Sequence, residues 1–258
     1  MTRRLFLGCA CCGGMTAGAR PLSAADPHLP TRLELGVAAM TRIAPDVWVA
    51  PLARGVWLHC TTAAIAGGVV YPANGLIVAS PRGAIMIDTA WNPDQARSLL
   101  AWSDKQGLPV STAVATHFHG DRTGGIPALR AAGVPVLASA DTCEQARRHG
   151  LPVPDTIAAF DRDVCLVDPD LELFYPGAGH SRDNIVAFVP SAGIVSGGCL
   201  VKSTTTDNLG YIADAILPAW PDSIRRVRAR YPFARHVVPG HGAVAGDNLS
   251  ATLALLKA

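Results

Sequence analysis

Charge is scarce in this sequence of 258 residues: only 16% of the positions are Asp, Glu, Lys or Arg, and the formal net charge is +2. Three of the basic residues lie in the first 25 positions, which contain no acid, so the rest of the chain carries 19 basic against 20 acidic residues. A protein that binds nucleic acid needs a concentrated positive field. This near balance therefore excludes DNA or RNA as the partner.

The sequence also lacks a linker or a low-complexity stretch that would divide it. Its apolar fraction of 49% supplies a sizeable core. Layered α/β proteins of this length often form one domain. We therefore predict a single domain over residues 26–258.

The first 25 residues have the composition of a targeting segment. A basic start, Met1–Arg4, is followed by an apolar run, Leu5–Gly18, which is too short and too rich in glycine to span a membrane. Small residues at Ser23–Ala25 suit cleavage. We predict a signal peptide over residues 1–25, similar to the twin-arginine type, and a bacterial periplasmic protein with no stable membrane association.

Apolar and β-branched runs alternate with turn residues, and they predict strands and helices in two similar blocks. Strands in blocks with helices interspersed indicate an α/β protein with two packed sheets and helices outside. The predicted strands are 46–50, 56–61, 69–80, 84–88, 110–115, 134–138, 163–167, 171–175, 185–189, 193–197 and 236–238. The predicted helices are 92–106, 126–130, 140–150, 221–230 and a last one from Asn248.

The most informative segment is Thr116–Asp121, where His117, His119 and Asp121 place three metal-binding side chains in five positions. Side chains at i, i+2 and i+4 do not share one face of a helix, whereas on an irregular turn they can diverge toward two neighbouring metal ions. The segment lies between a predicted strand and a predicted helix, where open α/β folds place their sites. It predicts a metal centre, against the simpler interpretation of a polar surface loop that contains histidines.

Three further metal-binding side chains, His180, Cys199 and His241, stand at predicted strand ends beside glycine. If all of them meet at one sheet edge, each of two metals has three ligands and open positions for water, which is typical of catalytic zinc. Considered alone, Cys199 could be a small buried apolar residue, and His180 or His241 could be an ordinary turn residue. Because all three occur together at glycine-flanked strand ends, the interpretation as metal ligands is favoured. The other histidines lack such settings, and we predict structural or surface roles for them: His28, His59, His149 and His236.

Cysteine pairing is left open by the sequence. Four cysteines remain after the signal segment: Cys60, Cys143, Cys165 and Cys199. In an oxidising compartment such a number suggests disulfides. A metal thiolate at Cys199 would leave an odd number, and at least one thiol unpaired.

The ordered ligand set resembles that of subclass B1 of the metallo-β-lactamases, and the resemblance runs from about Val47 to the C-terminus. The His-x-His-x-Asp pattern alone marks only the superfamily, which also holds thioesterases, lactonases and nucleases. Glyoxalase II-like members have a histidine after the aspartate, where this chain has Arg122, and an aspartate at the position of Cys199. These two positions favour the lactamase. The matching motifs are Gly55–His59, Asn74–Val78, Ile87–Trp91, Gly179–Asn184 and Gly197–Ser203.

The resemblance implies a four-layer αβ/βα sandwich with two zinc ions at one edge. A metal-bound hydroxide would hydrolyse the amide bond of β-lactam antibiotics, including penicillins, cephalosporins and carbapenems, and so confer resistance. Asp121 would also orient the nucleophile, which makes it a catalytic residue. The implied ligands are His117, His119 and His180 for the first zinc, and Asp121, Cys199 and His241 for the second.

Residues for the substrate follow from the same resemblance. Lys202 matches the lysine that pairs with the substrate carboxylate, and residues 61–70, with the apolar Ile65, match a mobile flap. Asp88 and Arg122 would hydrogen-bond to the ligands from beneath. Many relatives have asparagine where Tyr211 stands, so this tyrosine either donates to the lactam carbonyl or stacks on the substrate. The simpler interpretations are a solvated lysine and a structural aspartate.

Two other functions stay open at this point. One is a superfamily hydrolase that acts on thioesters or lactones, and the other is a zinc-binding protein without turnover. In each case the expected partner is a small molecule, and a monomer is the default assembly.

Overall fold

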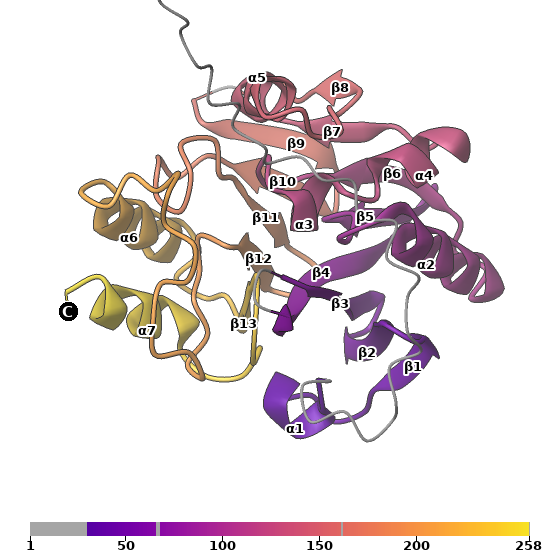
Figure 1. Cartoon of the computed structure of the whole chain (residues 1–258), viewed down its shortest axis with the longest axis horizontal. Coiled ribbons are helices and arrows are strands. Elements are labelled where there is room, and N and C mark those ends of the chain that lie inside the picture. Colours follow the sequence, from indigo (N-terminus) through magenta and orange to yellow (C-terminus); the bar gives the residue numbers. More distant parts are fainter. Residues whose placement is uncertain (1–29, 66–67, 161, 258) are drawn as a thin grey trace, which may run out of the picture.

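Two β-sheets pack face to face in the computed structural model, which describes residues 30–65, 68–160 and 162–257, and helices cover the outer face of each sheet (Figure 1). This arrangement confirms the predicted four-layer α/β sandwich. The predicted signal peptide lies outside the described residues. Among the residues that are described, no helix is long and apolar enough to cross a membrane.

The first sheet has eight strands in the order of the sequence. Its first five strands form an antiparallel meander, and each later strand is added in parallel after a helical connection. The strands are β1 (Thr41–Ala44), β2 (Val47–Ala53), β3 (Val56–Ala64), β4 (Val70–Ser80), β5 (Gly83–Ile87), β6 (Val110–Val114), β7 (Val136–Ala138) and β8 (Thr156–Ile157). The helices between them are α2 (Pro93–Lys105), α3 (Gly120–Thr123), α4 (Ile126–Ala131) and α5 (Ala140–Arg148).

The second sheet has five strands and follows the same plan, with antiparallel strands first and one parallel strand after a helix. The two blocks of the sequence therefore correspond to the two sheets. The elements are β9 (Val164–Asp168), β10 (Leu171–Phe174), β11 (Val186–Val189), β12 (Ile194–Gly198), α6 (Trp220–Arg230), β13 (His236–Pro239) and α7 (Asn248–Leu255).

Three apolar clusters fill the three spaces between the four layers. Ile85 and Ile87 of β5 belong to the cluster between the sheets, whereas Met86 packs in the cluster under α2 and α4. In β12, Ile194 likewise faces the other sheet and Val195 faces α6. Because successive side chains of a strand point to opposite faces, strands covered on both sides are apolar at nearly every position. This explains why the central strands were predictable as continuous apolar runs.

Helix α2 shows how local sequence sets the limits of an element. Asn92 caps its first turn by accepting hydrogen bonds from the amides of Asp94 and Gln95, and Pro93 occupies the first helical position. The helix ends at Lys105, so the predicted range of 92–106 is confirmed. Four short elements were not predicted: β1, α3, β8 and α1 (Arg32–Leu35). Each has only two to four residues, too few for a periodic pattern.

A close approach between two loops places the segment that carries the metal-binding cluster. The turn from α3 to α4 passes so near the loop after β5 that a Cβ atom at Gly124 would lie 2.0 Å from the carbonyl oxygen of Trp91. At Gly125 the corresponding distance to the carbonyl oxygen of Thr89 is 1.9 Å. Only glycine fits at both positions. The two loops are therefore packed backbone against backbone at the edge of the first sheet.

Candidate metal centre

All six predicted ligands lie in connections at one edge of the two sheets. His117, His119 and Asp121 follow β6, with Asp121 inside α3. His180 lies between β10 and β11, Cys199 directly follows β12, and His241 stands two residues after the end of β13. Both sheets therefore contribute to the centre, as predicted from the spacing of the first three ligands and from the glycine-flanked strand ends of the other three.

Three imidazole rings face one another at this edge, and we call His117, His119 and His180 the imidazole set. Nδ1 of His119 lies 3.0 Å from Nε2 of His117 and 3.1 Å from Nε2 of His180. Burial, with neighbouring imidazoles for His117 and the ammonium of Lys202 for His180, holds the pKa of both rings well below the usual value. Both are neutral at pH 7, so each has a nitrogen lone pair to offer to a metal.

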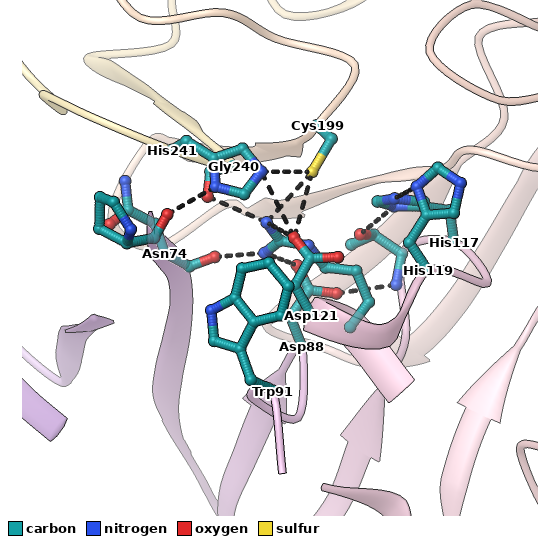
Figure 2. Close-up of polar contacts among 12 residues, drawn as sticks. Asn74, Asp88, Trp91, His117, His119, Asp121, Cys199, Gly240 and His241 are labelled. Carbon is teal, nitrogen blue, oxygen red and sulfur yellow. Dashed lines mark hydrogen bonds and ion pairs between the residues drawn. The ribbon is translucent and has the colours of Figure 1, made fainter. Parts of the chain in front are cut away.

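A second group, the thiol set, consists of Asp121, Cys199 and His241 (Figure 2). The sulfur of Cys199 lies 3.1 Å from Nε2 of His241 and 3.5 Å from Oδ2 of Asp121, and these last two atoms are 3.4 Å apart. A tetrahedral zinc with ligands at about 2.0–2.3 Å holds its ligand atoms roughly 3.3–3.8 Å apart. The thiol set therefore fits zinc with little rearrangement.

The two sets are adjacent. Ligand atoms of His117, His180 and Cys199 lie within 4.8 Å of one another, so the thiol of the second set also borders the first. The structure thus contains two candidate metal-binding clusters whose nitrogen, oxygen and sulfur donors suit zinc.

Arg122 lies fully buried beneath the thiol set. Its guanidinium donates to Oδ2 of Asp88 at 2.9 Å and to the sulfur of Cys199 at 3.1 Å, and it pairs with Asp121 at 2.8 Å. It also donates to the carbonyl oxygens of Asn74 and Gly240. Asp88 in turn accepts the amide of Thr116 at 2.9 Å. The carboxylate and the guanidinium therefore connect the first metal-binding loop to the strand ends that carry Cys199 and His241.

Burial and this guanidinium set the protonation of the thiol set. Burial acts against ionisation of Asp121, but the nearby guanidinium of Arg122 outweighs it and lowers the pKa of the carboxyl to about 2. For Cys199 burial prevails and raises the pKa of the thiol to about 12, although Arg122 opposes it. Burial lowers the pKa of His241 to about 4. Without a metal, Asp121 is ionised, His241 is neutral and the thiol keeps its proton. A metal would displace that proton.

Nitrogens that face away from the clusters have their own partners. Nε2 of His119 lies 3.0 Å from Oδ2 of Asp214, and Nδ1 of His241 lies 2.6 Å from the carbonyl oxygen of Pro72. Such contacts fix which nitrogen of the ring is free to bind a metal. Asp214 was not predicted as a site residue, because it stands in a loop without a recognisable motif.

Lys202 is buried beside the imidazole set. Its ammonium stands 5.3 Å from the ring centroid of Trp220, and no carboxylate pairs with it among the described residues. Burial lowers the pKa of this lysine. It also lines a cavity of about 500 Å³ together with Tyr71, Ser203, Asn208 and His241. The ammonium of Lys202 therefore lies in the cavity wall, and His241 places the thiol set at the same cavity.

Tyr211 and Ile65, two residues predicted to contact the substrate, are both exposed at the surface. Tyr211 is 60% exposed, and its ring stands edge-on to that of His119, with ring centroids 5.4 Å apart. Its hydroxyl is hydrogen-bonded to Asp214. Ile65, 40% exposed, closes the end of the β3–β4 hairpin by donating its amide to the carbonyl oxygen of Val69 at 2.9 Å. Residues 66 and 67 of the predicted flap lie outside the described residues.

The remaining histidines and cysteines do not join the clusters. His59 is buried with Nε2 3.2 Å from the carbonyl oxygen of Ile87, and the exposed ring of His149 packs against Phe118. His28 lies outside the described residues. The four described cysteines are all free and buried, so none of them forms a disulfide with another.

Comparison with known proteins gives the same family from sequence and from structure. The sequence model of the Metallo-beta-lactamase superfamily matches residues 68–256. "Metallo-beta-lactamase type 2" of Bacteroides fragilis is 36% identical over 209 residues, which are 81% of this chain and 84% of that protein. The enzyme of the same description from Bacillus cereus is 36% identical over 212 residues, or 81% of this chain and 82% of that protein.

Two solved structures show the same fold. A metallo-β-lactamase from Erythrobacter litoralis, with beta mercaptoethanol in its active site, superposes with a TM-score of 0.81 at 35% identity and covers 85% of this chain and 99% of its own. The metallo-β-lactamase FIM-1 from Pseudomonas aeruginosa, in a mono-zinc form, gives a TM-score of 0.79 at 37% identity, with 82% and 95% covered.

Proposed function

The chain belongs to the metallo-β-lactamase superfamily, and on this premise we propose that it is a subclass B1-like zinc enzyme that hydrolyses the amide bond of β-lactam antibiotics. Penicillins, cephalosporins and carbapenems are the proposed substrates, and antibiotic resistance is the proposed consequence.

The observation that carries this proposal is the composition of the thiol set. Arg122 stands where glyoxalase II-like relatives have an additional metal-binding histidine, and its side chain lies beneath the cluster, bonded to Asp88 and Cys199. Cys199 takes the place of their bridging aspartate. The centre therefore lacks both features that would favour a thioester or lactone hydrolase.

We propose that the imidazole set holds one zinc ion and the thiol set a second. When bound, zinc supplies a Lewis acid that activates water and polarises the scissile amide at neutral pH. Asp214 holds Nε2 of His119, so that Nδ1 points to the other imidazoles. The carboxylate of Asp121 has one oxygen near Cys199 and His241 and is kept ionised by Arg122, so it can accept a hydrogen bond from the attacking water and orient it.

We propose residues that contact the substrate, on the basis of their charge and their exposure. A buried ammonium without a carboxylate partner is costly, and the carboxylate of a bicyclic β-lactam would supply the missing anion to Lys202. Ile65 and Val69 expose apolar surface on the β3–β4 hairpin, where a substituent of the lactam can pack. Tyr211 would contact the substrate with its exposed ring, because its hydroxyl is already bonded to Asp214.

Location and assembly are proposals that rest on the sequence. The basic start, apolar run and small residues of positions 1–25 favour export to the periplasm of a bacterium. A monomer is proposed as the working unit, since one chain brings all six proposed ligands together.

One assay decides among the candidate functions. The zinc-loaded protein is mixed with nitrocefin, a penicillin, a cephalosporin and a carbapenem, each with and without a chelator, and with a thioester as the comparison substrate. We expect turnover of the lactams that the chelator abolishes and zinc restores. Turnover of the thioester alone would favour the other hydrolase class, and turnover of neither would indicate a zinc-binding protein without this activity.

A further inference from the structure

Asp183 is a buried carboxylate that bonds to the segment between two ligands of the imidazole set. It is only 1% exposed and stands three residues after His180, in the connection between β10 and β11. Its Oδ2 accepts the backbone amide of Phe118 at 2.9 Å. Phe118 separates His117 from His119, so this hydrogen bond reaches the middle of the first metal-binding loop.

The cost of burying this group suggests a role beyond packing. No lysine or arginine pairs with Asp183 among the described residues, unlike Asp88, which pairs with Arg122. A buried carboxylate is unfavourable unless hydrogen bonds compensate for the lost water. The amide of Phe118 is such a compensating donor, and the bond gains strength if the acceptor carries charge.

This hydrogen bond links the two sheets at the centre. The loop of His117 and His119 follows β6 of the first sheet, whereas the loop of His180 belongs to the second. Besides the bond to Phe118, only one backbone hydrogen bond joins these two loops among the described residues, from the amide of Ile185 to the carbonyl oxygen of Thr116 at 2.9 Å. The backbone of the first loop is therefore held against the second loop by two adjacent bonds, one of which ends on Asp183.

Phe118 passes this restraint on to the ligands. Its ring lies edge-on to that of His119, with centroids 4.4 Å apart, and it is covered on another side by His149 at 4.7 Å. Phe118 as a whole is only 3% exposed. A shift of the Phe118 backbone would move both neighbouring histidines against His180, and metal sites tolerate errors of only about 0.5 Å in such positions.

We propose that Asp183 is a positioning residue that holds the first metal-binding loop against the loop of His180 and so sets the metal affinity of the imidazole set. The proposal rests on the proposed function only in assuming that this set binds zinc. It assigns Asp183 no contact with the metal or the substrate, and it predicts a selective effect. The thiol set should lose much less affinity, because Asp121, its one ligand on this loop, is also held by Arg122 at 2.8 Å, and Cys199 and His241 lie on other connections.

The test measures metal binding at each set separately. Zinc affinities come from competition with a chromophoric chelator, and Co²⁺ in place of zinc reports the thiol set through the charge-transfer band of the Cys199 thiolate. D183A removes the acceptor, and D183N keeps its shape with a neutral oxygen that accepts more weakly. D141N is the matched control, because Asp141 pairs with Arg182 of the same loop but on the solvent side, at 2.9 Å.

For D183A we expect the affinity of the imidazole set to fall about 10–100-fold, as for other residues that orient metal ligands. For D183N we expect a severalfold fall in the same affinity. In both variants the charge-transfer titration should shift much less than the affinity of the imidazole set does, and D141N should match the unchanged protein at both sets. Lactam turnover is not part of this readout, so loss of the proposed activity leaves the result interpretable.

Two outcomes would overturn the proposal. The first is an unchanged metal affinity of the imidazole set in D183N. This variant tests the proposal even if D183A does not fold. The other is an equal loss at both sets together with a lower melting temperature, as expected if Asp183 only supports the fold.

Discussion

Lys202 shows at the scale of a residue how an unpaired charge indicates a ligand. Replacing it with alanine should raise KM for carboxylate-bearing lactams about 10–100-fold, because a charge-assisted hydrogen bond contributes about 1.5–3 kcal/mol, and should change kcat much less. Steady-state kinetics with a penicillin measure both constants. Lys105, exposed at the end of α2, is the control. An unchanged KM in K202A would contradict the assignment.

Tyr211 stands where the resemblance to the family led us to expect asparagine. Because its hydroxyl is hydrogen-bonded to Asp214 and its ring is exposed, we expect Y211F to keep kcat within about threefold, whereas Y211A should raise KM through loss of the ring. The two variants are compared by steady-state kinetics on the same cephalosporin. A large drop in kcat for Y211F alone would instead identify the hydroxyl as a donor to the reacting carbonyl.

Asp214 acts on His119 from the side opposite the cluster. In D214N the amide can present its NH₂ group to the ring and favour the wrong tautomer, so zinc affinity of the imidazole set should fall about 10–100-fold. Competition with a chelator measures this fall. D222N, which alters an exposed acid in the first turn of α6, should leave both affinities unchanged. Equal affinities in D214N and the unchanged protein would remove Asp214 from the centre.

Glu172 illustrates a connection between elements, because it joins β10 to the end of α6. Arg230 and the hydroxyl of Tyr231 both donate to it, at 2.8 and 2.7 Å. Burial acts to raise the pKa of this carboxyl, but the two hydrogen bonds outweigh it and the pKa is lowered. A lowered pKa in the folded state adds stability above the pKa of the unfolded chain, and this stability is lost as the pH falls through the folded value.

E172Q should therefore be less stable than the unchanged protein at pH 7, by about 1 kcal/mol for a partly exposed group. The difference should shrink as the pH falls below about 4.5, the ordinary range of a glutamate. Urea unfolding at several pH values measures it. E144Q, on the exposed face of α5, should show a smaller difference, and a constant difference for E172Q across this pH range would contradict the explanation.

Elements were predictable from the sequence where burial imposes a pattern. The central strands are covered on both faces, and α2 has a cap and an initial proline, so their ranges follow from local residues. The ligands were predictable because His117, His119 and Asp121 are closely spaced after a strand, and because His180, Cys199 and His241 stand beside glycine at strand ends. By contrast, the contact of Asp214 with His119 depends on how a long loop returns to the centre, over 95 residues of separation. No local pattern encodes such a contact.

At the scale of the whole molecule, the ligand clusters connect the two sheets. Zinc should therefore stabilise the folded protein, by about 4 kcal/mol when free zinc exceeds Kd a thousandfold. For a domain of this size this corresponds to a rise in Tm of roughly 8–16 °C. Calorimetry with zinc and with a chelator checks it. The same Tm in both conditions would indicate that the clusters do not bind the ion in the folded state.

The charges of Arg122 and its neighbours also affect which charge of metal ion the thiol set accommodates. Around this one guanidinium stand two carboxylates, those of Asp88 and Asp121, so the buried group has one negative charge in excess. Binding a metal removes the proton of Cys199 and adds a second negative charge. A divalent cation brings the sum to zero, whereas a monovalent or trivalent ion leaves a net charge in a medium of low dielectric constant. Among the charges of Arg122, Asp88, Asp121 and Cys199 alone, neutrality therefore favours a divalent ion; the ammonium of Lys202 and a metal at the imidazole set lie outside this sum.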